Sequence, residues 1–265
     1  MMPTVKPESE LTQEEKERLR TYYNNKGWEL YHGQYEGNPN ISQAKHWFEK
    51  AAKLGCSQAM VNLGNIHEEA QEYEQAYTCY LEAAYAGNKQ GMYNVANMYH
   101  WGWGVDQNYQ KAYEYFFQLY QEGYDGTAFY MGLYAENGFV AEKDYGKAVQ
   151  YYEEGINEGD KYSAANLAKM YCDGVGVEID YEKALEYYML ALVRGDDLAF
   201  AAIGHMYEYG DGVKKDLKKA ISYYQQGAEK KEENCMEALR RLNNEQRAEK
   251  SGQYRCFHGQ FTYDW

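Results

Sequence analysis

Histidine and cysteine are the residues in this chain best suited to chemistry, as metal ligands or as a nucleophile with its base. The sequence holds six histidines and five cysteines. None of the histidines stands with cysteines or carboxylates in the spacing of a zinc site, and no Cys-x-x-Cys pair occurs. We therefore predict no metal and no cofactor, and interpret the cysteines as reduced thiols in small core positions of a cytoplasmic protein. The cysteines are Cys56, Cys79, Cys172, Cys235 and Cys256.

Arrangements for nucleophilic or acid–base catalysis are equally hard to find. Cys256 and His258 are close in sequence, but no further residues are in place to orient them. Paired acids such as Glu68 and Glu69 are typical of solvated helix faces, whereas general acid–base catalysis needs a buried cleft. The sequence thus predicts that the protein is not an enzyme.

Gly-x-Gly sequences, a third possible source of chemistry, recur at Gly102, Gly174 and Gly210. Such glycines can cradle phosphate when a strand precedes them and a third glycine follows. Here each pair lies between two predicted helices, so we interpret the glycines as turn residues that adopt positive φ and reverse the chain.

The charge balance excludes some partners. With 41 acidic and 27 basic residues the net charge is −14, which repels nucleic acid and anionic membrane surfaces. The first ten residues carry charges and a proline where a secretory signal needs an apolar core, and no later stretch approaches the ~18 apolar residues that span a bilayer. We therefore expect a soluble protein that binds neither nucleic acid nor membranes.

The elements that carry these residues follow a repeat. A step of 36 residues leads from Gly102 to Gly138 and on to Gly174 and Gly210. Apolar residues three and four apart precede and follow each glycine turn, which predicts two helices per repeat. The step also relates Lys111, Lys147, Lys183 and Lys219, and the alanine after each of them. Small residues inside the helices, such as Ala96, Gly132, Ala168 and Gly204, indicate close helix packing. Two weaker copies precede these four.

The motif Leu-Gly-x2-Tyr-x2-Gly-x-Gly-Val-x3-Tyr-x-Lys-Ala-x2-Tyr-Tyr resembles the Sel-1-like repeat, a relative of the tetratricopeptide repeat. The resemblance covers roughly residues 22–231, with departures at His67, Ala135 and Leu217. It implies an all-α fold: an α-solenoid of about six stacked antiparallel helix pairs with a C-terminal capping helix, used as a protein–protein interaction adaptor.

The expected organisation has four parts: a flexible N-terminus at 1–11, the solenoid at 12–232, a capping helix at 233–252 and an aromatic tail at 253–265. Thr12 and Glu15 form a capping box that predicts the start of the first helix. Met236, Leu239 and Leu242 form the apolar stripe of the capping helix. We expect the tail to fold back onto the last helices, or alternatively to dock into a partner.

In such a solenoid the first helix of each pair lines the inner face, which therefore predicts where a ligand binds. Rings, amides and acids on this face suggest an extended, basic peptide or protein segment, with Tyr93, Asn97, Trp101 and Phe129 at the centre. Any of these side chains could instead serve packing alone. The predicted binding residues are Asn65, Glu68, Tyr93, Asn97, His100, Trp101, Phe129, Leu133, Asn137, Lys169, Asp173, His205 and Tyr209.

Two other functions remain open. An immunity-type or regulatory antagonist would use the acidic surface to neutralise a basic partner protein. A β-lactam-hydrolysing enzyme is less favoured, because the relatives described with that activity carry a cysteine pair in each repeat, which this chain lacks.

Overall fold

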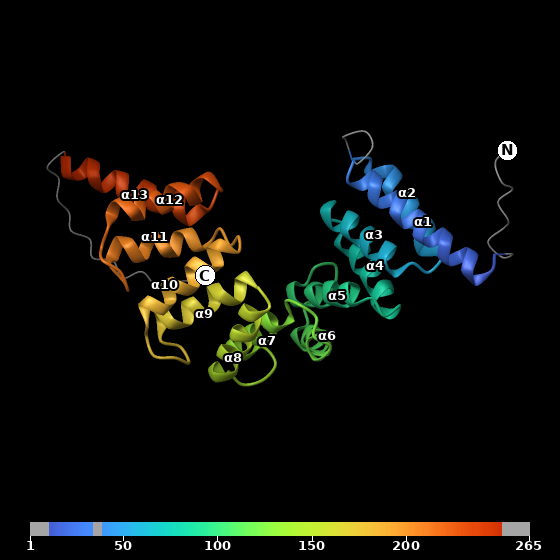
Figure 1. The fold of residues 1–265 in the computed structure, drawn as a ribbon, viewed down its shortest axis with the longest axis horizontal. Coiled ribbons are helices and arrows are strands. Elements are labelled where there is room, and N and C mark those ends of the chain that lie inside the picture. The colour runs from blue at the N-terminus through green and yellow to red at the C-terminus, as the bar shows by residue number, and fades with distance from the viewer. Residues whose placement is uncertain (1–10, 34–38, 251–265) are drawn as a thin grey trace. The chain divides into compact units, whose positions relative to one another are not determined.

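The computed structural model describes residues 11–33 and 39–250, apart from the side chains of 248–250, and all of its regular structure is helical (Figure 1). The aromatic tail and most of the expected N-terminal segment lie outside the described residues. The helices are α1 (Gln13–Tyr31), α2 (Ile41–Lys53), α3 (Ser57–Glu69), α4 (Tyr73–Tyr85), α5 (Lys89–Trp101), α6 (Tyr109–Gln121), α7 (Thr127–Asn137), α8 (Tyr145–Asn157), α9 (Lys161–Asp173), α10 (Tyr181–Val193), α11 (Ala199–Tyr209), α12 (Leu217–Glu229) and α13 (Glu233–Lys250).

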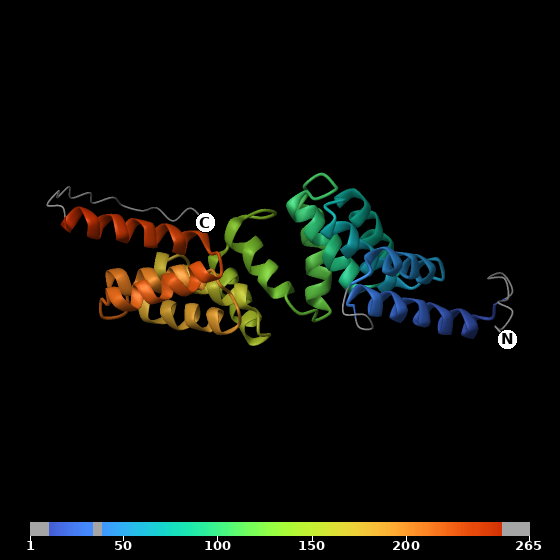
Figure 2. The ribbon, with the colours of Figure 1, turned by 90° about the horizontal axis from the view of Figure 1, so that it is seen from above.

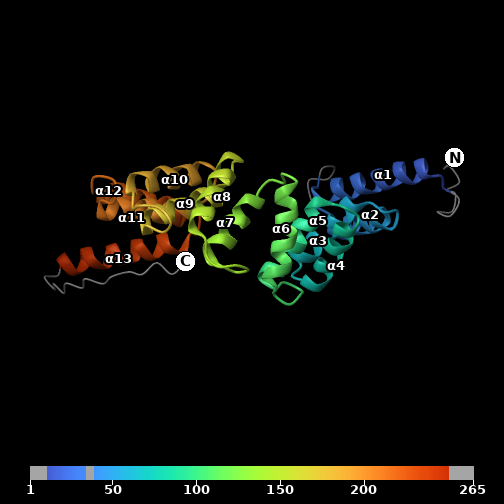
Figure 3. The same ribbon diagram turned by 90° about the horizontal axis from the view of Figure 1, so that it is seen from below.

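The chain divides into two compact units, an N-terminal unit that ends at Lys143 and a C-terminal unit that begins at Asp144. The N-terminal unit holds the pairs α1/α2, α3/α4 and α5/α6, followed by α7 (Figure 3). The C-terminal unit starts with α8 and holds the pairs α9/α10 and α11/α12. The predicted solenoid of antiparallel helix pairs is confirmed, with α7 and α8, the fourth pair of the sequence, on either side of the unit boundary.

The predicted capping helix is also present. Figure 2 shows α13, in red, alongside the orange helices that end the repeat array, and it packs against α12 and α11. Arg241 on α13 forms a 2.7 Å ion pair with Glu208 on α11, whose side chain is almost fully buried. The apolar contact comes from Leu242, which joins a cluster with Phe200 and Tyr224. Charge and apolar area together therefore hold this helix on the last repeat.

Polar caps begin most of the helices. Thr12 and Glu15 form the predicted capping box, with reciprocal bonds of 3.2 and 2.8 Å. The second helix of most pairs begins at an Asn or Asp whose side-chain oxygen accepts the N–H three residues later, which stabilises the first turn. These caps are Asn40, Asn108, Asp144, Asp180 and Asp216.

The Gly-x-Gly turns have the conformation that the sequence predicts. Gly102, Gly174 and Gly210 end α5, α9 and α11 with φ of 72°, 68° and 90°. The second glycine has an additional role, because a Cβ at Gly104 would lie 2.2 Å from the carbonyl oxygen of Tyr73 on α4. Each turn therefore lies directly against the backbone of the preceding repeat.

Glycines inside the helices mark close packing within a pair, as predicted. A Cβ at Gly64 would lie 2.3 Å from the Tyr80 ring, and one at Gly204 would lie 2.5 Å from the Tyr224 ring. Both tyrosines are buried at the centre of their pairs. A glycine on the first helix thus makes room for a large ring from the second.

The cysteines among the described residues, Cys56, Cys79, Cys172 and Cys235, are free thiols. Cys256 lies outside the described residues. Within the described part of the chain, no helix combines the length and apolarity needed to span a membrane.

Candidate binding surfaces

The predicted binding residues fall into two sets because the unit boundary separates them. Those from Asn65 to Asn137 lie on α3, α5 and α7 of the N-terminal unit. Lys169, Asp173, His205 and Tyr209 lie on α9 and α11 of the C-terminal unit. Each set is therefore described within its own unit.

Two residues at the predicted centre connect α5 to α7. The Asn97 amide donates to the Tyr93 carbonyl at 3.1 Å, and its oxygen accepts a hydrogen bond from Tyr130 on α7. The Tyr93 ring is half-buried among Phe116, Tyr124 and Tyr130, at centroid distances of 5.7 to 5.9 Å. Both side chains thus take part in packing, whatever they contribute to binding.

His100 differs from the surface position that the helical offsets predict. Its side chain is 3% exposed, and its Nδ1 lies 2.9 Å from the Tyr134 hydroxyl. Rings of Tyr109 and Phe139 cover it further, at 5.4 and 5.8 Å. Burial lowers the pKa of the imidazole, which favours the neutral form. The surface prediction for His100 is therefore wrong, because rings of α6, of α7 and of the loop that follows α7 close over this face of α5.

Asn65 and Glu68 face their own partner helix. The hydroxyl of Tyr80 on α4 lies 2.8 Å from the Asn65 oxygen and 2.6 Å from a Glu68 oxygen. Because Tyr80 is fully buried, these acceptors satisfy its hydroxyl at the edge of the core. Their first role is to hold α3 and α4 together.

Trp101 is exposed, as predicted, with 52% of its surface open to solvent. Its ring stacks on Trp103 with a centroid distance of 6.0 Å, and Trp103 stacks on Tyr73 at 5.7 Å. We call Tyr73, Trp103 and Trp101 the aromatic ladder.

The predicted residues on α7 are less uniform in exposure. Phe129 and Leu133 are half-buried, whereas Asn137 is exposed and donates to the Leu133 carbonyl at 2.9 Å.

The predicted residues of the C-terminal unit are partly exposed. His205 is half-buried, with its ring 4.3 Å from that of Tyr209 and its Nδ1 3.9 Å from Asp211. Burial lowers the pKa of His205 and outweighs the opposite effect of Asp211. Tyr209 and Asp173 are exposed, and Lys169 is half-buried.

A row of amide side chains, missed in the sequence, runs across the first helices of the N-terminal unit. Asn62 donates to Asn24 of α1 at 3.1 Å, and Gln58 donates to Asn62 and to Gln90 of α5, both at 3.4 Å. We call Asn24, Gln58, Asn62 and Gln90 the amide row. Gln58 and Asn62 are spaced one helical turn apart, a signal that was available in the sequence.

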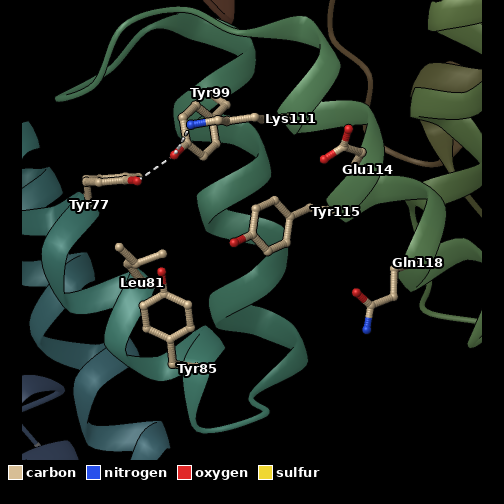
Figure 4. A pocket seen from close by; sticks show the side chains of 8 residues that line it. All are labelled: Tyr77, Leu81, Tyr85, Tyr99, Lys111, Glu114, Tyr115 and Gln118. Carbon is tan, nitrogen blue, oxygen red and sulfur yellow. Dashed lines mark hydrogen bonds between the residues drawn. The ribbon is translucent and has the colours of Figure 1, made fainter.

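A pocket, also missed, opens on the side of the second helices, with a volume of about 430 Å³ (Figure 4). We call it the tyrosine pocket. Lys111 Nζ lies 5.0 Å from the centre of the Tyr99 ring and 3.5 Å from its hydroxyl, which is itself 2.7 Å from the Tyr77 hydroxyl. Burial raises the pKa of Tyr77 and of Tyr115, so both hydroxyls stay protonated. The lining residues are Tyr77, Leu81, Tyr85, Tyr99, Lys111, Glu114, Tyr115 and Gln118.

The C-terminal unit has a smaller pocket of about 330 Å³. It is lined by Tyr207, Val213, Lys214, Lys215, Asp216 and Lys219, so lysines dominate its polar wall. Within the described residues, no group of three His, Cys, Asp or Glu side chains is placed to hold a metal ion.

Stacked helix pairs with glycine turns and surface pockets define an α-solenoid of the helical-repeat class. The chain belongs to the Sel1 repeat family: the Sel1 repeat matches residues 24–56, 89–124, 127–160, 161–192 and 199–231. Residues 59–90 match a tetratricopeptide repeat. Proteins built from these repeats typically mediate protein–protein interactions, and their scaffolds are generally non-catalytic.

Solved structures show the same fold. A protective antigen present in uropathogenic Escherichia coli strains is 27% identical, with a TM-score of 0.67 over 83% of this chain and 49% of that protein. A Sel1 repeat protein from Oxalobacter formigenes is 23% identical, with a TM-score of 0.68 over 84% and 65% of the two chains. This chain thus spans about half to two thirds of their lengths.

An immunity protein from Pseudomonas aeruginosa is similar at 17% identity, with a TM-score of 0.55 over 86% of this chain and 88% of that one. At this identity the likeness concerns the fold alone. No curated protein matches the sequence.

Proposed function

We propose that this chain is a non-catalytic interaction scaffold that binds an extended, basic segment of a partner protein. The segment lies on the first helices of the N-terminal unit, along the amide row and toward Trp101. The observation that carries the proposal is the amide row, which joins α1, α3 and α5 by side-chain hydrogen bonds.

Amide side chains suit an extended ligand because each offers both donors and acceptors to backbone groups. Gln58 and Gln90 are exposed at this row. On α5, Gln90, Asn97 and Trp101 are spaced seven and four residues apart, which places them along one face of the helix.

We infer that the ligand is basic from the exposed ring of Trp101 and from the net charge of the chain. The exposed Trp101 face attracts a Lys or Arg side chain by a cation–π interaction. The net charge of −14 steers basic partners toward the protein. On this proposal Phe129, Leu133 and Asn137 of α7 provide further contacts, and Lys169, Asp173, His205 and Tyr209 serve the C-terminal unit in the same way.

A phage-displayed library of random 12-residue peptides, selected on the full chain, tests the proposal. We expect enrichment of Lys and Arg, and at least about tenfold weaker binding of a selected basic peptide to the double variant Trp101→Ala, Gln90→Ala. Asn97 is left intact because its bond to Tyr130 joins α5 to α7. Tyr181→Ala, which removes an exposed ring from a second helix of the C-terminal unit, is the control. Unchanged binding to the double variant would count against the surface.

A second candidate function is the antagonism of a basic partner protein. It is supported by the acidic charge and by the fold shared with the Pseudomonas aeruginosa immunity protein. The test is to co-express the chain with the product of an adjacent gene and to measure growth. Protection of growth, together with a purified complex, supports antagonism, and a lack of both rejects it.

A further inference from the structure

The tyrosine pocket presents several hydroxyl groups to one space. It is formed by α4, α5 and α6, and the hydroxyls of Tyr77, Tyr85 and Tyr115 point toward its interior (Figure 4). Neither Tyr85 nor Tyr115 forms a hydrogen bond through its hydroxyl with another described residue. Leu81 and the ring faces supply apolar wall beside these donors. The pocket therefore matches a ligand that carries both an acceptor and an apolar group.

The charge of Lys111 distinguishes this pocket from the same motif position in α8 and α10. Lys147 forms an ion pair with the cap residue Asp144 at 3.1 Å, and Lys183 with Asp180 at 3.7 Å. The cap of α6 is Asn108, which is neutral. Lys111 forms no ion pair with a carboxylate among the described residues. Its ammonium group remains beside the Tyr99 ring at the pocket, available to a carboxylate from outside.

Glu114 is the acid that lines the pocket, and it does not compensate Lys111. The Glu114 carboxylate accepts a hydrogen bond from Gln110 at 3.0 Å, and its side chain is exposed. Glu114 is thus engaged with Gln110, whereas Lys111, which is also exposed, holds its ammonium group beside the Tyr99 ring.

We propose that the tyrosine pocket binds an acidic segment of a partner protein: an Asp or Glu carboxylate meets Lys111 and the hydroxyls, and a neighbouring aromatic or large aliphatic side chain packs on Leu81 and the tyrosine rings. Charge complementarity favours this occupant, because the wall offers one cation that forms no ion pair among the described residues and several hydroxyl donors. The volume of about 430 Å³ is within the ~300–1,000 Å³ range of ligand pockets. This site is separate in chemistry from the surface proposed for a basic segment.

Three fluorescein-labelled nine-residue peptides test the proposal with the full chain. They share one frame and a central Phe, flanked by Glu in the first, Gln in the second and Lys in the third. We expect the Glu peptide to bind at least about tenfold more tightly than the Gln peptide in fluorescence anisotropy, because the carboxylate adds charge-assisted bonds. Replacing the central Phe by Ala removes the apolar contact and also weakens binding.

A charge reversal provides the decisive comparison. In Lys111→Glu the preference reverses, and the Lys peptide binds more tightly than the Glu peptide. Lys183→Glu changes the same motif position in α10 and the same net charge, and it leaves the Glu peptide's affinity unchanged. Thermal unfolding of each variant verifies that the fold is intact.

The outcomes separate this proposal from the one above. Binding of the Glu peptide persists in the double variant Trp101→Ala, Gln90→Ala, so failure of either site is seen independently. The proposal is overturned if the Glu and Gln peptides bind equally, if neither binds, or if Lys183→Glu weakens binding as much as Lys111→Glu.

Discussion

The same group of two tyrosines and a lysine occurs in both units and has almost the same geometry. In the N-terminal unit, Lys111 lies 5.0 Å from the Tyr99 ring, which stacks on a ring of α6 at 15°. In the C-terminal unit, Lys219 lies 5.0 Å from the Tyr207 ring, which stacks on a ring of α12 at 8°. The repeat motif alone therefore sets this local arrangement.

The surroundings of the group differ between the units. In the N-terminal unit, α4 adds Tyr77, Leu81 and Tyr85, which makes the wall aromatic and leaves a single lysine. In the C-terminal unit, the turn before α12 adds Lys214 and Lys215, which makes the wall basic. The two pockets share the geometry of the motif but differ in their neighbouring residues. The repeat motif therefore builds the scaffold, while residues outside the motif decide what each pocket can bind.

The largest effect is expected where the two units are most alike, at the buried tyrosine of each pair. Tyr80 and Tyr224 both bind a first-helix carboxylate, Glu68 or Glu208, and both fill the space over a helical glycine. We expect Tyr80→Ala and Tyr224→Ala each to lower the free energy of unfolding by about 3–5 kcal/mol in urea denaturation. A loss of less than about 1 kcal/mol in either unit would show that the pairs are not equivalent.

The next effect should appear in the C-terminal unit alone, where Arg241 adds an ion pair to Glu208. Arg241→Ala leaves a buried carboxylate with fewer donors, and we expect it to lower the free energy of unfolding by about 2 kcal/mol. Arg240→Ala removes an exposed arginine from the same helix and is expected to have little effect. Equal losses in the two variants would contradict the role of the ion pair.

The pH dependence of unfolding follows from the same carboxylate. Burial raises the pKa of Glu208, but hydrogen bonds from Arg241 and Tyr224 outweigh it, so the pKa lies below the usual value. Its stabilising contribution is therefore complete above the unfolded pKa and is lost as pH falls through the lower folded value. In Arg241→Ala the loss should begin at a higher pH than in the natural chain, as measured by acid titration of helicity. Identical acid-titration curves for Arg241→Ala and the natural chain would contradict this prediction.

A smaller effect is expected from exchanging the cap residues that distinguish Lys111 from Lys183. Asn108→Asp gives α6 the acidic cap of α10, so we expect the affinity for the Glu peptide to fall about fivefold, or ~1 kcal/mol. Asn and Asp are equivalent caps, so the free energy of unfolding should change by less than about 0.5 kcal/mol. Asn40→Asp in α2, where Gln43 occupies the lysine position, is the control. Unchanged peptide affinity would contradict the role assigned to the neutral cap.

The smallest effect concerns the lysine–ring contact itself. Lys111→Met and Lys219→Met each remove one cation–π interaction at an exposed site, which costs about 0.5–1 kcal/mol. We expect equal losses in the two units by urea denaturation. A clear difference would mean that the surroundings already affect stability at this position.

The sequence determined the architecture of this protein. The 36-residue step, the Gly-x-Gly turns, the capping box and the final helix all predicted what the structure shows, because caps, positive φ and helical apolar spacing are local properties. Small residues such as Gly204 indicated close helix packing, and the structure shows that the Tyr224 ring packs there.

The tertiary structure decided which side chains remain available on the surface. The helical offsets assign both His100 and Trp101 to the binding surface, yet the rings that follow α5 in the sequence bury the first and leave the second exposed. The tyrosine pocket likewise needs side chains from α4, α5 and α6 around one space. The physical reason is that burial and pairing arise between elements distant in the chain, whereas periodicity reports only the helix on which a residue lies.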